Sequence, residues 1–221
     1  MSSWGKGILI AAVAIATLAA ATPRAEAILF GQISSAQSLE SGSIDAGAFV
    51  SVFEHATVLF GQYRQGLWRN GDFGIQAGFV DPEGGDVGLA LGGDLKFWVM
   101  SVEKNTPFDL AIQPRVGYFG MDNVSVFTLG ASAVISRDYG LSQGSLTPYG
   151  AINMRVEHFS FDNAVVPVTL SAKASSGGDD SNFEIGAIAG LKWDVSKSFD
   201  ILGEVVLDDD IGLTVGLNFK L

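Results

Sequence analysis

The chain has 221 residues, a formal net charge of -11 at pH 7, and no cysteine. The length allows one domain with a full core. The negative charge excludes nucleic-acid binding through phosphate contacts, and the lack of thiols excludes disulfides and thiolate metal sites. Only 17% of the residues are charged, and the mean hydropathy of +0.32 is high for a soluble domain.

Residues 1–27 have the three parts of a secretory signal peptide. Lys6 supplies a positive charge near the start, an apolar stretch runs from Ile8 to Ala21, and Ala25-Glu26-Ala27 is an A-x-A cleavage site. An uncleaved membrane anchor is the alternative, but the apolar stretch is short for a span. We therefore predict cleavage after Ala27.

Residues 28–42 show no clear period and are interpreted as a periplasmic lead-in. From residue 43 onward the dominant period is two, which is typical of strands. No window after the first 27 residues approaches the about 20 apolar residues of a membrane helix. We predict about ten strands, at 43–53, 56–64, 72–80, 86–100, 107–119, 123–136, 145–158, 182–195, 199–207 and 211–221.

In the strands with the clearest period of two, one face is apolar and the other is mixed. One face of the last strand consists of Ile211, Leu213, Val215, Leu217, Phe219 and Leu221, while the other carries Thr214, Asn218 and Lys220. A soluble sandwich would bury the apolar face in its core, whereas a membrane barrel would turn it toward lipid. High hydropathy without a spanning helix favours the barrel, because only helices and closed barrels satisfy their backbone polar groups in lipid.

Three features favour a barrel over a sandwich. The apolar stripes carry no charge, as expected where a basic residue costs about 2–4 kcal/mol at the bilayer midplane. The connection 195–198 is short, whereas 159–181 is long and polar, and the chain ends on a strand. We therefore predict an all-β fold: a single up-and-down antiparallel transmembrane β-barrel over residues 43–221, with about ten strands, or eight as the alternative.

The end of the chain carries a family resemblance. The stretch Gly190-Leu-Lys-Trp-Asp-Val-Ser-Lys-Ser-Phe-Asp-Ile-Leu-Gly-Glu-Val-Val resembles the penultimate hairpin of small OmpA- and OmpW-like outer-membrane barrels, and 211–221 is similar to their C-terminal targeting strand. The resemblance implies an outer-membrane location, contact with outer-membrane lipid and lipopolysaccharide, and recognition of the last strand by the barrel-assembly machinery. Those strands end in an aromatic residue, whereas this one ends in Leu221.

Proline is unusual in a central strand because it removes a ladder hydrogen bond. Pro114 falls inside the strand predicted at 107–119. We expect a bulge at this position, or a locally shifted strand.

Opposed charges fall on the inward positions of the predicted barrel. A barrel of eight strands is just filled by its own side chains, and buried charges must be paired. The favoured interpretation is a salt-bridge network that fills the lumen, and the alternative is a polar pathway for a small solute or ion; no cofactor is implied. The predicted network consists of Asp94, Lys96, Arg115, Arg155, Glu157, Glu184, Lys192, Glu204 and Lys220.

An enzymatic alternative rests on Glu157-His158-Phe159-Ser160. The H-x-S pair resembles that of PagL-type lipid A deacylases, which implies His158 as the base and Ser160 as the nucleophile. A third group must orient the base, and no glutamate lies between Ser160 and Glu184. A barrel without enzymatic activity is therefore favoured.

Asp208-Asp209-Asp210 and other acidic residues map to the end of the barrel opposite the chain terminus. Carboxylates bind hard cations such as calcium, but this run lacks the spaced ligands of an EF-hand loop. A solvated hairpin tip is favoured over a metal site. The functional hypothesis is a non-enzymatic barrel with a structural, surface-interaction or limited solute-passage role, and a soluble, secreted β-sandwich that binds a ligand is the remaining alternative.

Overall fold

The computed structural model describes residues 30–102, 106–121, 124–161, 180–208 and 210–221. The predicted signal peptide lies outside these residues and stays a prediction. In the described part, no helix is long and apolar enough to cross a membrane. The strands are β1 (Ile44–Val52), β2 (Ala56–Trp68), β3 (Gly71–Pro82), β4 (Gly88–Met100), β5 (Asp109–Met121), β6 (Val124–Ser136), β7 (Tyr139–Gly140), β8 (Ser145–Phe161), β9 (Asp180–Asp194), β10 (Phe199–Leu207) and β11 (Ile211–Lys220).

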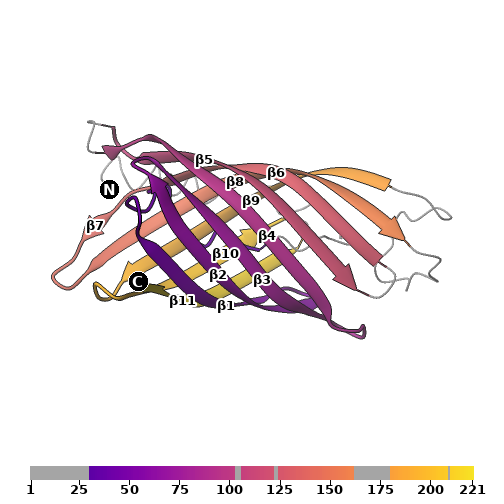
Figure 1. Cartoon of the computed structure of the whole chain (residues 1–221). Coiled ribbons are helices and arrows are strands. Elements are labelled where there is room, and N and C mark those ends of the chain that lie inside the picture. Colours follow the sequence, from indigo (N-terminus) through magenta and orange to yellow (C-terminus); the bar gives the residue numbers. More distant parts are fainter. Residues whose placement is uncertain (1–29, 103–105, 122–123, 162–179, 209) are drawn as a thin grey trace, which may run out of the picture.

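Ten of these strands form a closed antiparallel barrel (Figure 1). Consecutive strands pair from β1 to β6 and from β8 to β11, β6 pairs with β8, and β1 pairs with β11. The first and last strands thus close the wall, with Asp45 opposite Lys220 and Val52 opposite Leu213. We call the end that holds the start of β1 and the end of β11 the terminal end, and the opposite end the far end.

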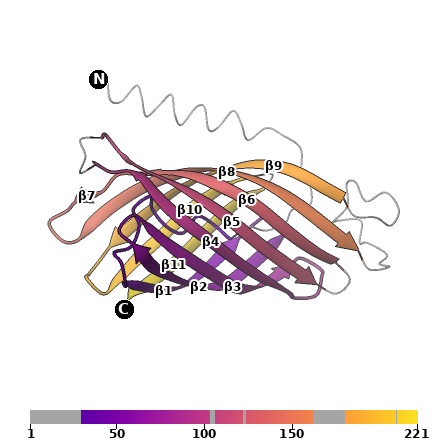
Figure 2. The same cartoon turned by 45° about the horizontal axis from the view of Figure 1, so that its top comes forward.

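The predicted fold class and strand number are confirmed. Each of the ten predicted strands corresponds to one strand of the barrel, and the alternative of eight strands is wrong. Alternating β-branched and aromatic residues favour this pleated, half-buried structure. The short strand β7 was not predicted; it pairs with the start of β8 in a hairpin at the terminal end (Figure 2).

The barrel is apolar outside and mostly polar inside. Along β11, Ile211, Leu213 and Val215 are exposed while Gly212 and Thr214 are buried. The same alternation runs along β2, β3 and β10. A soluble sandwich would show the opposite burial, because its apolar face would form the core.

Pro114 does not produce the expected bulge. Its pairing with Ala131 of β6 is in regular register. On the other side, the ladder between β4 and β5 is interrupted between the pairs Asp94–Arg115 and Phe97–Ile112, and the register shift occurs only at Trp98–Met100. The missing N–H of proline explains an interruption, and the bulge lies further along the wall.

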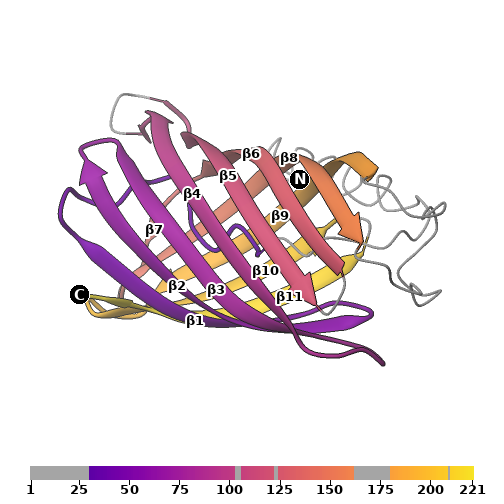
Figure 3. The same ribbon diagram turned by 45° about the vertical axis from the view of Figure 1, so that its right-hand side comes forward.

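Residues 30–39, which we call the lumen segment, lie inside the barrel instead of forming a periplasmic lead-in. Residues 30–36 are buried although they belong to no strand. The segment joins β1 at the terminal end and runs between the walls, in dark purple in Figure 3. At its inner end the Phe30 ring packs 4.8 Å from that of Phe60, which stacks on Phe49 at 5.2 Å. Apolar inward side chains near the far end therefore hold the tip of the segment.

Candidate functional site

The lumen is the candidate functional site, and its strongest ion-pair cluster spans β2, β3 and β4. Arg64 donates to Asp72 and, through Nη2, to both carboxylate oxygens of Asp94 at 2.7 Å. Lys96 Nζ lies 3.5 Å from Asp72. All four side chains are nearly inaccessible to solvent. Alternation along neighbouring strands turns these residues inward, so each buried charge finds an opposite one across the ladder.

A second cluster lies in the lumen toward the far end. Arg155 of β8 donates to Glu157 on the same strand and to Asp208, which follows β10. The predicted hairpin tip therefore contributes Asp208 to the lumen. Residues 155 and 157 share a face because side chains alternate with a period of two.

A third cluster lies at the terminal end. Lys220 of β11 donates to Asp194 of β9, and its Nζ lies 2.7 Å from Asp200 of β10. Lys192 lies 3.3 Å from Asp194 and 3.8 Å from Asp200. The two carboxylates thus share two ammonium groups, and the cluster links three consecutive strands where the barrel opens.

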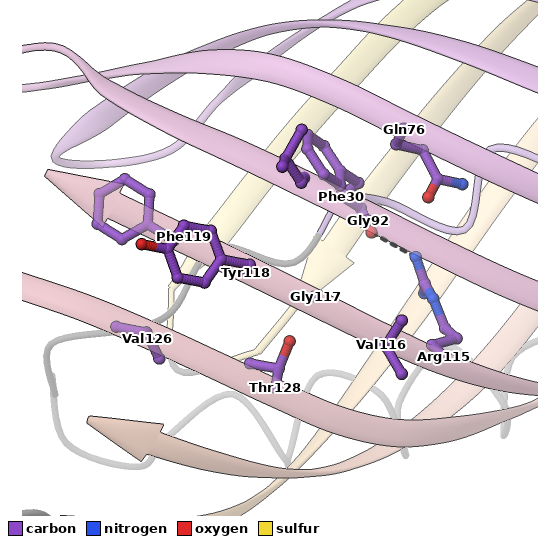
Figure 4. A pocket seen from close by; sticks show the side chains of 11 residues that line it. Phe30, Gln76, Gly92, Arg115, Val116, Gly117, Tyr118, Phe119, Val126 and Thr128 are labelled. Atoms are coloured by element: carbon purple, nitrogen blue, oxygen red, sulfur yellow. Dashed lines mark hydrogen bonds between the residues drawn. The ribbon is translucent and has the colours of Figure 1, made fainter. Parts of the chain in front are cut away.

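The lumen segment is held by side chains of the wall rather than by a strand ladder. Arg115 Nη2 donates to the carbonyl oxygen of Phe30 at 2.8 Å (Figure 4) and to that of Gly31 at 3.0 Å. Gln32 donates to Gln113 at 2.5 Å. The wall therefore satisfies backbone groups that burial would otherwise leave unpaired.

Glu204 is the anchor on the opposite wall. Its carboxylate accepts from the backbone N–H of Ile33, and Tyr149 Oη donates to the same oxygen at 2.6 Å. Ile33, Glu204 and Tyr149 are all buried. Two hydrogen bonds thus converge on one buried carboxyl oxygen, so Glu204 is a main holding point of the segment.

Further contacts hold the segment toward the terminal end. The Ala36 N–H donates to Ser136 Oγ at 3.1 Å, and the Leu39 N–H donates to Asp72 at 3.0 Å. Lys96 donates to the Gln37 carbonyl at 3.0 Å. The segment and the ion-pair network therefore form one connected polar system.

Little space is left around the segment. A cavity lies between Phe30 and the wall of β3, β4, β5 and β6, lined in part by Gln76, Arg115 and Thr128 (Figure 4). It offers about 10 Å³ to the centre of a water molecule, which is room for about one water. A solute larger than water does not fit beside the segment at this point.

The nine residues of the predicted network all lie on inward positions. Asp94, Lys96, Arg115, Arg155, Glu157 and Glu204 are buried, and Glu184, Lys192 and Lys220 are half-buried. The predicted network did not include Arg64, Asp72, Asp194, Asp200 and Asp208, which the structure places in the three ion-pair clusters, and the lumen segment was not predicted. Arg64 and Asp72 are the end residues of the strands predicted at 56–64 and 72–80. Assigning inward and outward faces up to these end residues would have placed both side chains in the lumen.

The pair proposed for the enzymatic alternative lies elsewhere. His158 is exposed on the outer face, and its Nδ1 lies 3.1 Å from Ser181 Oγ on β9. Glu184 is paired in register with the buried Arg155, so it faces the lumen on the opposite side of the wall from His158. The structure thus does not bring His158, Ser160 and Glu184 together as a catalytic triad.

We expect Ser160→Ala to leave lipid A unchanged, since Glu184 faces the lumen and therefore cannot orient His158 on the outer face of the wall. Mass analysis of lipid A from cells that express the wild type, the S160A variant or neither protein checks this. Loss of an acyl chain with the wild type but not with S160A would establish the deacylase alternative.

The three aspartates at 208–210 do not form one cluster in the structure. Asp208 pairs with Arg155, Asp209 lies outside the described residues, and Asp210 is half-buried. Among the described residues, no group of three His, Cys, Asp or Glu side chains is placed to hold a metal ion. The pairing of Asp208 with a guanidinium removes it from the set of free carboxylates that a hard cation prefers.

A closed antiparallel wall, a charge-bearing interior and an apolar exterior define a small β-barrel of the outer-membrane type. No protein-family model matches the sequence, and no curated protein matches it. Similar solved structures include the N-terminal β-barrel domain of Pseudomonas aeruginosa OprF, with 11% identity, a TM-score of 0.38, and coverage of 83% of this chain and 100% of that one.

Two other solved structures are similar in the same degree. The KdgM porin in complex with disordered oligogalacturonate has 9% identity, a TM-score of 0.41, and coverage of 80% of this chain and 98% of that one. Ail, the attachment invasion locus protein of Yersinia pestis, has 13% identity, a TM-score of 0.31, and coverage of 83% and 100%. Similarity at this level carries no information about ligand or activity.

Proposed function

We propose that the protein is a non-enzymatic outer-membrane barrel that is closed at rest and acts as a structural or surface-interaction component of the membrane. The observation that supports this most directly is the filled lumen: paired ions and the lumen segment occupy the interior. A wide diffusion pore needs an unobstructed water-filled channel, which a barrel of about ten strands barely accommodates even when empty.

The proposal includes a location and partners. The outward apolar side chains suit outer-membrane lipid and lipopolysaccharide, and β11, which is in register with β1, suits recognition by the barrel-assembly machinery. Phe108, Trp193 and Phe219 are exposed near strand ends at the terminal end, where an interfacial aromatic girdle is expected. Export by cleavage after Ala27 is part of the same proposal.

We expect the full mature protein to insert into planar bilayers without steady conductance in the nanosiemens range, because paired side chains and the lumen segment block the path. Insertion is checked separately by reconstitution into liposomes and by the shift in gel mobility on heating. Steady nanosiemens openings would contradict a closed barrel. A protein that stays soluble without detergent and shows no heat shift would contradict the membrane location.

A further inference from the structure

The wall of the barrel is complete without the lumen segment. Ladders join all ten strands of the ring, including β6 to β8 and β1 to β11. Side chains of the wall, Arg115, Glu204 and Ser136 among them, hold the segment. A backbone-to-backbone hydrogen bond with the wall follows the segment, where the Gly42 N–H donates to the Gly66 carbonyl at 2.9 Å. Withdrawal of residues 30–39 would therefore break none of the ladders of the ring.

The conformation of the segment is strained at its centre. Ile33 has a φ of 42°, in the left-handed region, which is unfavourable for a β-branched residue. The strained residue, Ile33, is also the residue whose backbone N–H donates to Glu204. The segment therefore stays in place because specific wall contacts offset the strain, and loss of one strong contact shifts the balance toward withdrawal.

The lumen that the segment would vacate is negatively charged. Among the described residues, ten inward carboxylates face six inward cations: Asp45, Asp72, Asp94, Asp109, Glu157, Glu184, Asp194, Asp200, Glu204 and Asp208 against Arg64, Lys96, Arg115, Arg155, Lys192 and Lys220. Two of these cations, Lys96 and Arg115, donate to carbonyl oxygens of the segment when it is in place. An excess of carboxylates along a narrow pore attracts cations and repels anions.

We infer that residues 30–39 are a displaceable plug, and that the lumen opens to a narrow passage for small inorganic cations when the plug withdraws toward the terminal end. This inference rests on the proposed membrane function but goes beyond it, since a permanently filled barrel would serve a structural role equally well. The contacts between the plug and the wall determine whether the passage is open, and the wall itself does not rearrange.

A disulfide lock tests the inference in the full mature chain. The chain has no cysteine, so A36C combined with S136C introduces a single thiol pair, at positions joined by the Ala36 N–H to Ser136 Oγ bond. In potassium chloride bilayers we expect brief openings under reducing conditions, with a reversal potential that shows cation preference. Oxidation should reduce the open probability at least about tenfold, and reduction should restore it.

Thiol accessibility provides a second measurement that does not need the disulfide to form. Ala36 is fully buried, so A36C reacts with a charged, water-soluble methanethiosulfonate only when the plug has moved. In alkaline buffer, where the Glu204 carboxyl group is ionised, we expect Glu204→Gln to raise the labelling rate by about tenfold or more, because the neutral amide oxygen is a weaker acceptor for the Ile33 N–H than a carboxylate. The heat shift on gels verifies that the E204Q barrel is still folded.

The outcomes separate the two proposals. Equal labelling of A36C with and without the E204Q substitution, or equal conductance of the locked and reduced forms, would overturn the plug while leaving the closed membrane barrel intact. Openings that prefer chloride would overturn the assignment of cations. Failure of the unlocked protein to enter bilayers at all would contradict the membrane function and the plug together.

Discussion

Replacing Arg64 with methionine is expected to lower the free energy of unfolding by about 3–5 kcal/mol, because it leaves buried carboxylates without their main partner. Arg64 is 2% exposed and bonds both Asp72 and Asp94. The remaining contacts, such as Gln76 to Asp94 at 2.9 Å, are too few to compensate for a lost guanidinium. Urea unfolding of the protein refolded into detergent or liposomes, followed by the heat-shifted gel band, measures the effect.

Arg69→Met is the matched control for this prediction. Arg69 lies in the exposed turn between β2 and β3, so its replacement removes the same charge with a change of at most about 0.5 kcal/mol. Adding D72N and D94N to R64M should recover part of the loss, since both sides of the ion pair are then neutral. If R64M and R69M unfolded at the same urea concentration, the ion-pair cluster around Arg64 would not stabilise the barrel.

Val215→Arg is expected to destabilise the barrel in lipid bilayers by about 2–4 kcal/mol, the cost of a basic side chain at the bilayer midplane. Val215 lies in the middle of β11, between Val50 of β1 and Gly203 of β10, and its side chain is 53% exposed on the outer face. Folding yield and urea midpoint in liposomes measure the effect.

Ile211→Arg provides the depth control. Ile211 begins the same strand on the same face and is 63% exposed, but near an interface an arginine costs only about 0–1 kcal/mol. The difference between V215R and I211R therefore reports the depth of each position in lipid. Two equally mild variants would indicate that water, and not lipid, surrounds the barrel, as in a soluble protein.

The inward charges show how far sequence reasoning reaches into the site. Alternation placed Asp94, Lys96 and Glu204 inside, because a period of two separates faces without any knowledge of the partner strand. It did not show which charges meet. Arg155 bonds Asp208 across 53 positions, and such a pair depends on the register between strands, which is a property of the whole ring.

The sequence by itself determined where the strands lie and which face of each is apolar, since both depend on neighbouring residues in one pleated strand. Only the tertiary structure decided that β1 meets β11 to close the ring and that residues 30–39 fill its interior. The lumen segment has no period of its own. Its position depends on contacts such as Ile33 to Glu204, 171 positions apart, which exist only once the barrel encloses them.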